Sequence, residues 1–562
     1  MKLVFHLWLI LMLLVGSLPA QWSTDPSVNT RVTDGGLLPQ IISDGSGGTF
    51  IVYQDTPALL RQLWVQWLDR FGYVRFPDNG IRISSADRYQ TPYYYLVSDS
   101  AGGVIVLFEE RHLVGDPFDE VTYNAIYAQH MDSSGTKLWG DAGVELSPFI
   151  EGERKGAISA CSDGANGAFV FWGEDGESNG AFELRAQRIT ANGQFAWPDT
   201  GLVVTDKFIF DNISNPNPAV SDGARNAIIL YSDSSGTKLQ KVNADGAFMW
   251  GDGMSLFPLG RQMIADNFGG AIVAGVRREF DGISVKFIVG ANRLGASGQV
   301  LWGHKGTTIE DSLAQSTQTR VYLAKHQQGG IVIGLRIFDF DTGTRKRISR
   351  RISNEGVLVW ANDTLGGQVV TDDFGNSIFL SFEHVSDSEL NFFVQRVDDN
   401  GVELWDMPVL FSKTGGSNMV TDTHGGVIAY WSEIGANSRF GIFAQQISRN
   451  GNLGEVLVTS VSAPGKTHIH TQFLLHQSYP NPFNAETLIK YEIPESYFVT
   501  LIIYDIAGKE VLKLVDEKQP PGTYQVTWNG KNKKGGEVAS GIYFYQLRAG
   551  SFVESKKAVF IK

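Results

Sequence analysis

The sequence contains eight copies of a pattern with one internal spacing: in most copies a glutamine, then a polar turn ending in glycine six residues later, and then an aromatic residue four residues after the glycine. It is clearest in the stretch Asn124–Trp139, where Gln129, Gly135 and Trp139 hold the three places. A constant spacing across two apolar runs and a tight turn predicts a β-hairpin of fixed register. The first two places are held elsewhere by Gln66 and Gly72, Gln187 and Gly193, Gln240 and Gly246, Asn292 and Gly298, Arg350 and Gly356, Gln395 and Gly401, and Gln445 and Gly451. The third place is held by Phe76, Trp197, Trp250, Trp302, Trp360, Trp405 and, in the last copy, Glu455.

A second recurring turn precedes each of these hairpins. In the stretch Ser43–Tyr53, Asp44 opens a turn that Gly48 closes, and an apolar run follows. The aspartate position recurs as Asp99, Asp163, Asp222, Asp266, Asp372 and Asp422, with His326 in one copy. The residue four places later is glycine or asparagine, which tolerate the left-handed backbone conformation that such turns require. The run after each turn is apolar at successive positions, which is typical of a strand covered on both faces.

The two turns together give each unit four strands in about 50 residues, a period typical of β-propellers. We therefore expect an all-β fold in which residues 21–460 form a β-propeller of about eight four-stranded blades, with seven blades as the alternative. Sheets that are apolar on both faces must stack against neighbours, so the tryptophans should pack between blades and the glutamines should bond backbone groups. Residues 21–38 could pair with the last blade and close the ring, although residues 455–461 look like a final strand of the eighth unit itself.

The N-terminus and the composition indicate an exported protein. Residues 1–20 carry Lys2, a leucine-rich run over 7–15 and small residues up to Ala20, the features of a cleaved secretory signal. An uncleaved anchor is the alternative, but the run is short for a membrane span, and no later stretch is long enough to cross a bilayer. The net charge of −13 and the pI near 5.3 argue against a nucleic-acid-binding surface. The single cysteine, Cys161, permits no internal disulfide and is expected to be a small buried residue.

The composition changes towards the C-terminus. Residues 461–476 read as a linker, and its pair His468 and His470 has no third ligand that would make a metal site. Residues 477–562 form a second domain, in which short alternating strands are expected at 487–493, 499–504, 524–528, 542–547 and 558–561. Several short antiparallel strands in fewer than about 90 residues predict an immunoglobulin-like β-sandwich.

Five motifs of this domain keep a fixed order: Y-P-N-P-F-N from Tyr479, I-Y-D-I-A-G-K-E-V from Ile503, P-G-T-Y-Q-V-T-W-N-G from Pro521, V-A-S-G-I-Y-F-Y-Q-L from Val538, and S-K-K-A-V-F-I-K from Ser555. In this the domain resembles the type A C-terminal sorting domain of the bacterial type IX secretion system, which is similar to the immunoglobulin-like module of flagellar hook-capping proteins. The resemblance implies Sec export to the periplasm, passage across the outer membrane by the type IX machinery, and release or attachment at the cell surface. The residues that carry it are Pro480, Asn481, Pro482, Phe483, Asn484, Gly508, Gly522, Tyr524, Gly541, Tyr543 and Lys557. The hook-capping module is the alternative, with the same fold and no secretion role.

A column of acidic residues stands where the apolar strand of each unit meets a loop of variable length. Its members are Asp55, Glu110, Glu174, Asp233, Glu383 and Glu433, and Arg277 and Ile337 take the place in the other two units. Two positions earlier come the aromatic residues Tyr53, Phe108, Trp172, Tyr231 and Trp431. Variable loops on a rigid scaffold commonly carry binding sites, so we treat the acidic column with Trp172 and Trp431 as candidate ligand-binding residues for a cation, a basic partner or a sugar. The alternative is that each carboxylate caps a turn or pairs with an arginine or lysine of its own unit.

Standard catalytic and metal-binding signatures are missing from the sequence: there is no H-E-x-x-H, P-loop, G-x-S-x-G or C-x-x-C. Each aspartate turn has a single carboxylate, too few for a calcium cage, and no cofactor is expected. We therefore expect an exported, non-catalytic protein that binds a glycan or a protein partner. The alternative is a secreted hydrolase of polysaccharides, for which Glu110 and Glu174 are the candidate pair of carboxylates.

Overall fold

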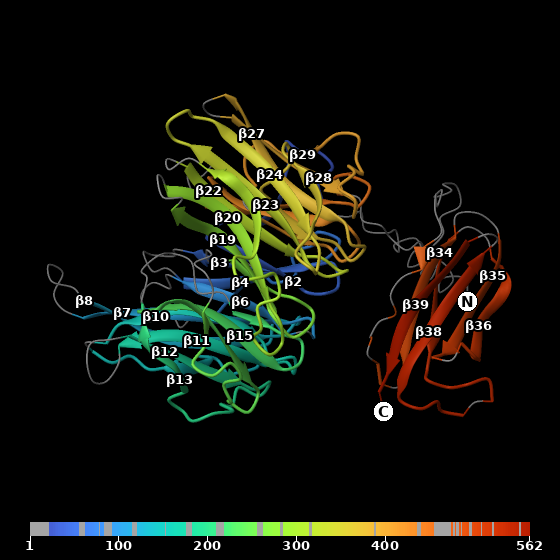
Figure 1. Ribbon diagram of the computed structural model, residues 1–562, viewed down its shortest axis with the longest axis horizontal. Coiled ribbons are helices and arrows are strands. Elements are labelled where there is room, and N and C mark those ends of the chain that lie inside the picture. Colours follow the sequence, from blue (N-terminus) through green and yellow to red (C-terminus); the bar gives the residue numbers. More distant parts are fainter. Residues whose placement is uncertain are drawn as a thin grey trace, which may run out of the picture. The chain divides into compact units, whose positions relative to one another are not determined.

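The computed structural model describes residues 22–561, with gaps at 56–61, 78, 84–92, 100, 115–120, 152, 176–181, 210–218, 256–261, 281–284, 314–316, 387–388, 417, 435–439, 455–473, 476–477, 479–480, 482, 485, 494–496, 507, 520–521, 535 and 550–551. The described residues form strands and turns and contain no helix (Figure 1). They divide into two compact units, Met1–Val456 and Leu457–Lys562. The predicted signal over residues 1–20 and almost all of the predicted linker lie outside the described residues.

The first unit is built from antiparallel sheets whose strands follow one another along the chain. The first two sheets have four strands each, in the orders β2-β3-β4-β5 and β6-β7-β8-β9. Their strands are β2 (Leu37–Ser43), β3 (Thr49–Asp55), β4 (Gln62–Leu68), β5 (Ile81–Arg82), β6 (Tyr94–Ser98), β7 (Val104–Val114), β8 (Val121–Met131) and β9 (Val144–Ser147).

The next eight strands join in one sheet, but a single residue pair, Phe208 with Asp233, links its two halves. Each half repeats the four-stranded pattern. The first half consists of β10 (Lys155–Ser162), β11 (Ala168–Asp175), β12 (Phe182–Ile189) and β13 (Leu202–Phe208), and the second of β14 (Ala219–Ser221), β15 (Asn226–Asp233), β16 (Gly236–Asn243) and β17 (Met254–Ser255).

Three further four-stranded sheets follow in the same order, and the last sheet takes one strand from the N-terminus. The three are β18 (Gln262–Ala265), β19 (Ala271–Phe280), β20 (Val285–Leu294) and β21 (Thr307–Leu313); β22 (Thr317–Lys325), β23 (Ile331–Asp339), β24 (Arg345–Ile352) and β25 (Leu358–Asn362); and β26 (Gln368–Thr371), β27 (Ser377–Ser386), β28 (Glu389–Val397) and β29 (Val409–Ser412). The last sheet has the order β1-β32-β31-β30, with β1 (Thr30–Thr33), β30 (Asn418–Thr421), β31 (Val427–Ile434) and β32 (Phe440–Ile447).

The first strands of successive four-stranded groups lie against one another. β2 contacts β6, and the series continues through β10, β14, β18, β22 and β26 to β30, which contacts β2 again. The apolar core is divided accordingly into eight buried clusters, each shared by two successive groups. In β3, Phe50 and Val52 belong to the cluster shared with β6–β9, whereas Ile51 and Tyr53 belong to the cluster shared with the last sheet. Alternate residues of a strand point to opposite faces, so each sheet is buried on both sides, as its continuous apolar runs predict.

The recurring glutamine and tryptophan positions have the roles that the sequence predicts. Gln129 donates to the carbonyl of Gly140 at 2.7 Å and accepts from the backbone amides of His130 and Trp139, so it fastens the hairpin turn. The Trp139 indole donates to the carbonyl of Ala191 in the next group at 2.9 Å. Trp197, Trp250, Trp302 and Trp405 donate in the same way to carbonyls of Ala244, Ala296, Asn354 and Arg449. Each glycine of the next hairpin turn lies under such a ring; a Cβ atom on Gly193 would stand 2.9 Å from Trp139, and its φ of +76° also favours glycine.

The N-terminal segment joins the last sheet to the first. Thr30 of β1 pairs with Ala444 of β32, and the carbonyl of Ser23 accepts from the side chain of Gln445 at 2.5 Å. Trp22 is 4% exposed, packs on Gly72 and donates to the carbonyl of Arg70 at 2.9 Å. Trp22 therefore supplies the contact that the last repeat, with Glu455 at its third place, has no tryptophan to make. The final strand considered at residues 455–461 lies outside the described residues.

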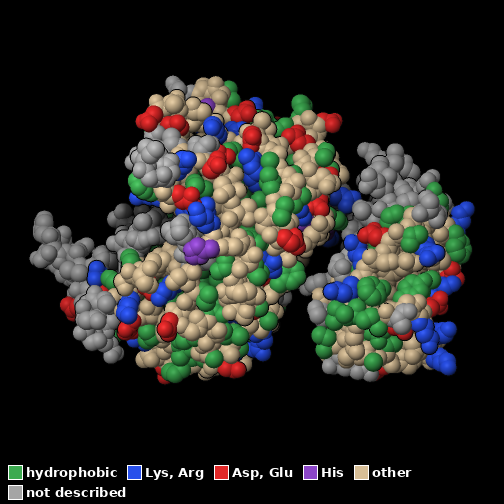
Figure 2. All heavy atoms as spheres, in the orientation of Figure 1, with side chains coloured by type: hydrophobic (Ala, Val, Ile, Leu, Met, Phe, Trp, Pro, Cys, Tyr) green, Lys and Arg blue, Asp and Glu red, His purple; other side chains and the backbone are tan. Residues whose placement is uncertain are grey.

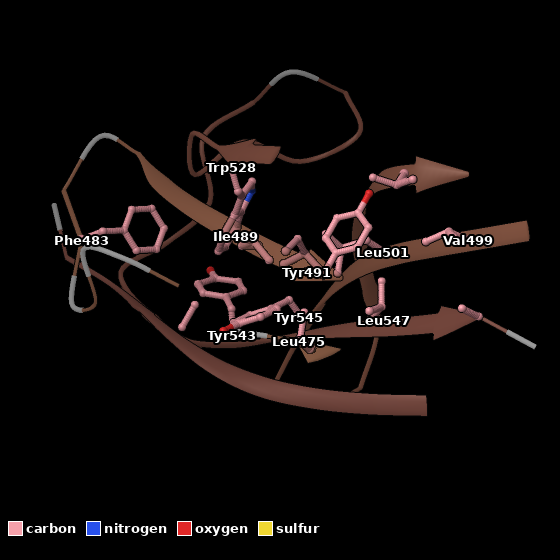
Figure 3. Packing of buried hydrophobic residues seen from close by; sticks show 14 of the residues in the cluster. Leu475, Phe483, Ile489, Tyr491, Val499, Leu501, Trp528, Tyr543, Tyr545 and Leu547 are labelled. Atoms are coloured by element: carbon pink, nitrogen blue, oxygen red, sulfur yellow. The ribbon is translucent and has the colours of Figure 1, made fainter. Parts of the chain in front are cut away.

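The C-terminal unit is a sandwich of two antiparallel sheets. One has the order β33-β34-β37 and the other β36-β35-β38-β39. Leu475, Tyr491 and Trp528 from the first sheet meet Leu501 and Tyr545 from the second in one buried core (Figure 3). The strands are β33 (Leu474–Leu475), β34 (Thr487–Ile493), β35 (Tyr497–Asp505), β36 (Glu510–Gln519), β37 (Gly522–Trp528), β38 (Gly541–Ala549) and β39 (Phe552–Phe560).

Replacing Trp22 with alanine tests the role of the N-terminal segment. Loss of a buried tryptophan typically lowers the free energy of unfolding by about 3–5 kcal/mol, so Trp22→Ala should lower the urea midpoint of the first unit clearly. Val28→Ala is the matched control, because Val28 belongs to the same segment but is 60% exposed. Equal midpoints for the two variants would show that the segment does not hold the first and last sheets together.

Candidate functional site

The acidic column lies at the loop end of the second strand of its sheets. Asp55 and Asp233 end β3 and β15, and Glu110, Glu174, Glu383 and Glu433 lie near the ends of β7, β11, β27 and β31. These strands occupy equivalent places in their sheets, so the structure brings the six carboxylates to the same end of the first unit. Most residues of the loops that follow, 56–61, 115–120, 176–181, 387–388 and 435–439, lie outside the described residues.

Three side chains bind the Glu174 carboxylate, two from its own group of strands and one from the preceding group. The Arg185 guanidinium lies 2.5 Å from one carboxylate oxygen, and the Trp172 indole and the Ser147 hydroxyl donate to the other at 2.8 and 2.9 Å. Both oxygens of the Glu174 carboxylate are therefore bonded to side chains of the sheets themselves.

Other members of the column also have local partners. Asp233 lies 3.0 Å from Lys238 and accepts from the backbone amide and hydroxyl of Ser235. Burial opposes ionisation of Asp233, but these bonds outweigh it and lower the pKa of its carboxyl. Glu433 accepts from the Trp431 indole at 3.3 Å, whereas Glu383 is exposed, with Arg347 3.9 Å away.

Glu110 and its neighbour Glu109 are both buried, at 2% and 1% exposure, and alternate along β7. Glu109 accepts from the side chain of Asn124 at 3.1 Å, and Asn124 also donates to the carbonyl of Lys155 in the next group. Glu110 lies on the opposite side of the strand, the side of Phe108, which packs towards β2–β5. The two strands that carry Glu110 and Glu174 belong to successive groups, and neither carboxylate is exposed to solvent to a large extent.

The aromatic positions two residues before the column are buried between sheets. Trp172 and Trp431 are each 1% exposed, and each belongs to the cluster that its sheet shares with the preceding sheet. Burial, together with the charge of Asp55, raises the pKa of the Tyr53 phenol, which donates to the carbonyl of Asn79. In the described residues these rings act as packing surfaces, and the indoles of Trp172 and Trp431 donate to the column.

Sequence reasoning missed a column at the opposite end of the sheets, formed by the residue after each recurring glutamine. In four groups this residue is a cation that pairs with the aspartate of the preceding turn: Arg188 with Asp163, Lys241 with Asp222, Arg293 with Asp266, and Arg396 with Asp372, at 2.5–2.8 Å. His130 contacts Asp99 at 2.8 Å, and Trp67 and Gln446 donate to Asp44 and Asp422 at 3.0 Å. The signal was present in the sequence, because this position always holds a hydrogen-bond donor: Trp67, His130, Arg188, Lys241, Arg293, Arg351, Arg396 and Gln446.

These aspartates fasten the turns as well as the pairs. Asp163, for example, accepts from the backbone amides of Ala165 and Gly167 at 2.8 Å. The cation then reaches the next group: Arg293 donates to the carbonyl of Asn354 at 2.9 Å and Arg396 to that of Arg449 at 3.1 Å. The turn end of the first unit is thus a set of bonded buried charges.

In the C-terminal unit, the opening motif is clamped to the last strand. The side chain of Asn481 donates to the carbonyl of Lys557 and accepts from the amide of Val559, both at 2.8 Å. Phe483 bonds through its amide to Val559 and through its carbonyl to Ile561, both at 2.9 Å. Pro480 and Pro482 lie outside the described residues.

The other motif residues build turns and the core. Tyr524 stacks on Tyr491 at 5.5 Å between ring centroids, and Tyr543 packs edge-on against Trp528 and donates to the carbonyl of Ala539. Gly508 has a φ of +76° in the turn after β35. Asn484 follows the clamp, Gly522 and Gly541 begin β37 and β38, and Lys557 lies in β39 with an exposed side chain. The motif therefore specifies the fold of the domain more than a separate binding site.

Comparison with known proteins identifies part of the C-terminal unit. The family described as FlgD Ig-like domain matches residues 484–551, so this unit contains an immunoglobulin-like domain, as the sequence predicts. No curated protein matches the chain. No helix among the described residues has the length and hydropathy to span a membrane.

Solved structures with similarity to the chain are remote in sequence. One is a eukaryotic initiation factor, 9% identical, which covers 77% of this chain and 89% of that chain with a TM-score of 0.39. Another is PorZ of Porphyromonas gingivalis, described as an essential bacterial surface component of the type IX secretion system; it is 12% identical and covers 94% of this chain and 75% of that chain, with a TM-score of 0.22. Latent PorU of the same organism is 10% identical and covers 60% of this chain and 32% of that chain, with a TM-score of 0.15.

The turn-end aspartates predict how stability depends on pH. Burial opposes ionisation of Asp222, but bonds from Lys241, Asn226 and two backbone amides lower the pKa of its carboxyl. A carboxyl whose pKa is lower in the folded than in the unfolded state adds stability above its unfolded pKa of about 3.9, and this stability is lost as the pH falls through the folded pKa. The urea midpoint of Asp222→Asn should therefore lie furthest below that of the wild type near pH 7 and approach it below about pH 4. Asp245→Asn, at an exposed turn position, is the control, and a difference that stays constant from pH 7 to pH 3 would contradict the assignment.

Proposed function

We propose that this chain is an exported binding protein in which the first unit is an eight-bladed β-propeller with a ligand site at its loop end. The C-terminal unit is a sorting domain for the type IX secretion system. The mature protein is secreted or attached to the cell surface after Sec export. The main observation in support of this proposal is the immunoglobulin-like domain at 484–551 with its five ordered motifs, in a chain that also contains a repeat unit of stacked four-stranded sheets.

The propeller assignment is supported by the contacts of the first strands and by the core. A linear stack of sheets leaves two terminal sheets with an uncovered apolar face. Here β30 contacts β2, and one buried cluster contains Ile428 and Tyr430 of the last sheet together with Ile51 and Tyr53 of the first. Completion of the last sheet by an N-terminal strand is the arrangement expected for a ring of eight blades.

The binding role is favoured over hydrolysis by the bonding of the acidic column. A glycosidase of the usual kind needs two carboxyl groups that flank the bond to be cleaved, one of them protonated. Glu174, one of the proposed pair, has its carboxylate bonded to Arg185, Trp172 and Ser147, and Glu110 is 2% exposed. These contacts support the interpretation that the column serves its own sheets, so the ligand site consists of other groups at the loop end.

Export of the chain and of a truncated variant tests the sorting role. In a host with the type IX machinery, the full chain should reach the medium or the outer surface, and a variant without residues 478–562 should stay in the periplasm. A reporter that carries a Sec signal and residues 478–562 should be exported as the full chain is. Periplasmic retention of that reporter, while a native type IX substrate is exported normally, would contradict the sorting role.

The exported full chain also serves to test the binding role. On a glycan array it should retain at least one class of glycan, and the bound glycan should not be shortened. Turnover that disappears in Glu174→Gln would instead establish the hydrolase, and neither binding nor turnover would contradict both.

A further inference from the structure

The acidic column at the loop end is absent from two neighbouring sheets. The acidic column is interrupted only in β18–β21 and β22–β25, where Arg277 and Ile337 take its place. Towards the loop end of β22–β25 the sequence has five basic residues, Arg320, Arg336, Arg345, Lys346 and Arg347, but only the carboxylates Asp339 and Asp341, in a chain with a net charge of −13. A local basic region of this kind attracts anions from solution.

Three arginines of this sheet form a row across its strands. Arg320 of β22 pairs with Arg336 of β23, which pairs in turn with Arg347 of β24. Residues directly opposite each other in antiparallel strands point to the same face and lie about 5 Å apart at Cβ, and like charges in this arrangement repel one another. We name Arg320, Arg336 and Arg347 the arginine row. Burial and the two flanking arginines lower the pKa of the Arg336 guanidinium, whose charge nevertheless persists.

Two members of the row are held in place by the neighbouring sheet. The pairing of the short strand β26 with β27 begins at Gln368, which lies opposite Leu380. Arg336 donates to the carbonyl of Leu380 at 3.2 Å, and Arg347 donates to the carbonyl of Phe382. The Arg336 guanidinium also lies 4.8 Å from the ring centre of Phe382 and 5.7 Å from that of Tyr322. These contacts fix the two guanidinium groups but use only part of their five N–H donors.

The third member, Arg320, has an exposed side chain, and this side chain takes part in none of the hydrogen bonds or ion pairs found among the described residues. The carboxylate near the row, Glu383, is 3.9 Å from Arg347 and 65% exposed at its side chain. A distance of 3.9 Å with this exposure neutralises little charge. The row is therefore short of negative charge among the described residues.

An aromatic ring lies in the adjacent cross-strand row, and a second follows just after β23. Gln318, Phe338 and Arg345 occupy β22, β23 and β24 one step nearer the strand ends. The Arg345 guanidinium lies 5.6 Å from the ring centre of Phe338, which meets the 63% exposed Phe340 edge-on at 4.9 Å. Figure 2 shows basic side chains on the surface in the region of β20 and β22. Aromatic rings beside guanidinium groups offer a sugar an apolar face and its charged substituent a set of donors.

We propose that the arginine row binds the carboxylate or sulfate groups of an acidic polysaccharide, with the rings of Phe338 and Phe340 beside the sugar. Guanidinium groups bind such oxyanions through parallel N–H donors, and the bound anion relieves the repulsion within the row. The inference rests on the proposed binding role and names the ligand class and the part of the loop end that holds it.

The test compares Arg320→Gln with Arg225→Gln in the full chain. Arg320 has no bond whose loss would unfold the sheet, and Arg225 is an exposed arginine in the turn before β15, at the other end of its group. Binding is measured by isothermal titration with polygalacturonate, dextran sulfate and neutral dextran. We expect the wild type and Arg225→Gln to bind at least one of the two charged polymers and not dextran. Loss of one charge-assisted contact should weaken this binding about tenfold or more in Arg320→Gln. The wild-type affinity should also fall as salt is raised.

The two charged polymers distinguish carboxylate from sulfate as the group bound. Equal affinities of the two variants for a charged polymer would overturn the arginine row and leave the binding role standing. Binding of neutral glycans alone would likewise overturn the arginine row and leave the binding role standing. If the wild type binds neither charged polymer nor any glycan on the array, both the arginine row and the proposed binding role fail.

Discussion

The first unit depends on one constraint: each of its four-stranded sheets is apolar on both faces. Such a sheet is stable only when a neighbour covers each face, and alternate residues of the second strand, such as Phe50 and Ile51, belong to different buried clusters. Each sheet along the chain therefore needs the next sheet to cover its second face. At the last sheet it is met by the first sheet, whose Ile51 and Tyr53 pack on Ile428 and Tyr430. The N-terminal segment strengthens this junction, because it adds β1 to β32 and places Trp22 against Gly72 of the first hairpin turn.

The two ends of these sheets have different tasks. At the turn end, buried aspartates accept from turn amides and from a cation such as Arg188 or Arg396, which also reaches the next group. Breaking such a buried pair leaves an uncompensated charge and is costly, so this end is restricted to donors and aspartates. At the loop end the same strands carry Asp55 in one sheet, Glu174 in another and Arg336 in a third, and this variation is what a ligand site can use.

Much of the fold was predictable because it is repeated. One hairpin with Gln129, Gly135 and Trp139 predicts its copies, and the structure confirms the strands, the packing of Trp139 on the next turn and the bonding by Gln129. The roles of Trp22 and of the residue after each glutamine were missed. Trp22 stands outside the repeat, and Arg188 shows its partner only when the chain is folded. The candidate site was harder to predict from the sequence. Trp172 and Trp431 are residues of the type that stacks on sugars, but they are buried between sheets. The arginine row forms only because the register of β22, β23 and β24 places its three residues opposite one another.

The closure of the first unit by its N-terminal segment can be measured with a disulfide. Thr30 and Ala444 are opposite each other in β1 and β32, at a separation that a disulfide can bridge. Burial, aided by the charges of Asp222 and Asp163, raises the pKa of the Cys161 thiol, so this thiol should not compete. Thr30→Cys with Ala444→Cys should oxidise almost completely in the folded protein and join the two peptides in a mass-spectrometric digest. Thr30→Cys with Ser432→Cys should remain reduced, because Ser432 lies one strand further away on β31 and two residues from Tyr430, the partner of Ala444, so the two positions are more than about 10 Å apart. A first pair that forms no more disulfide than the second would contradict the account that the N-terminal segment closes the unit.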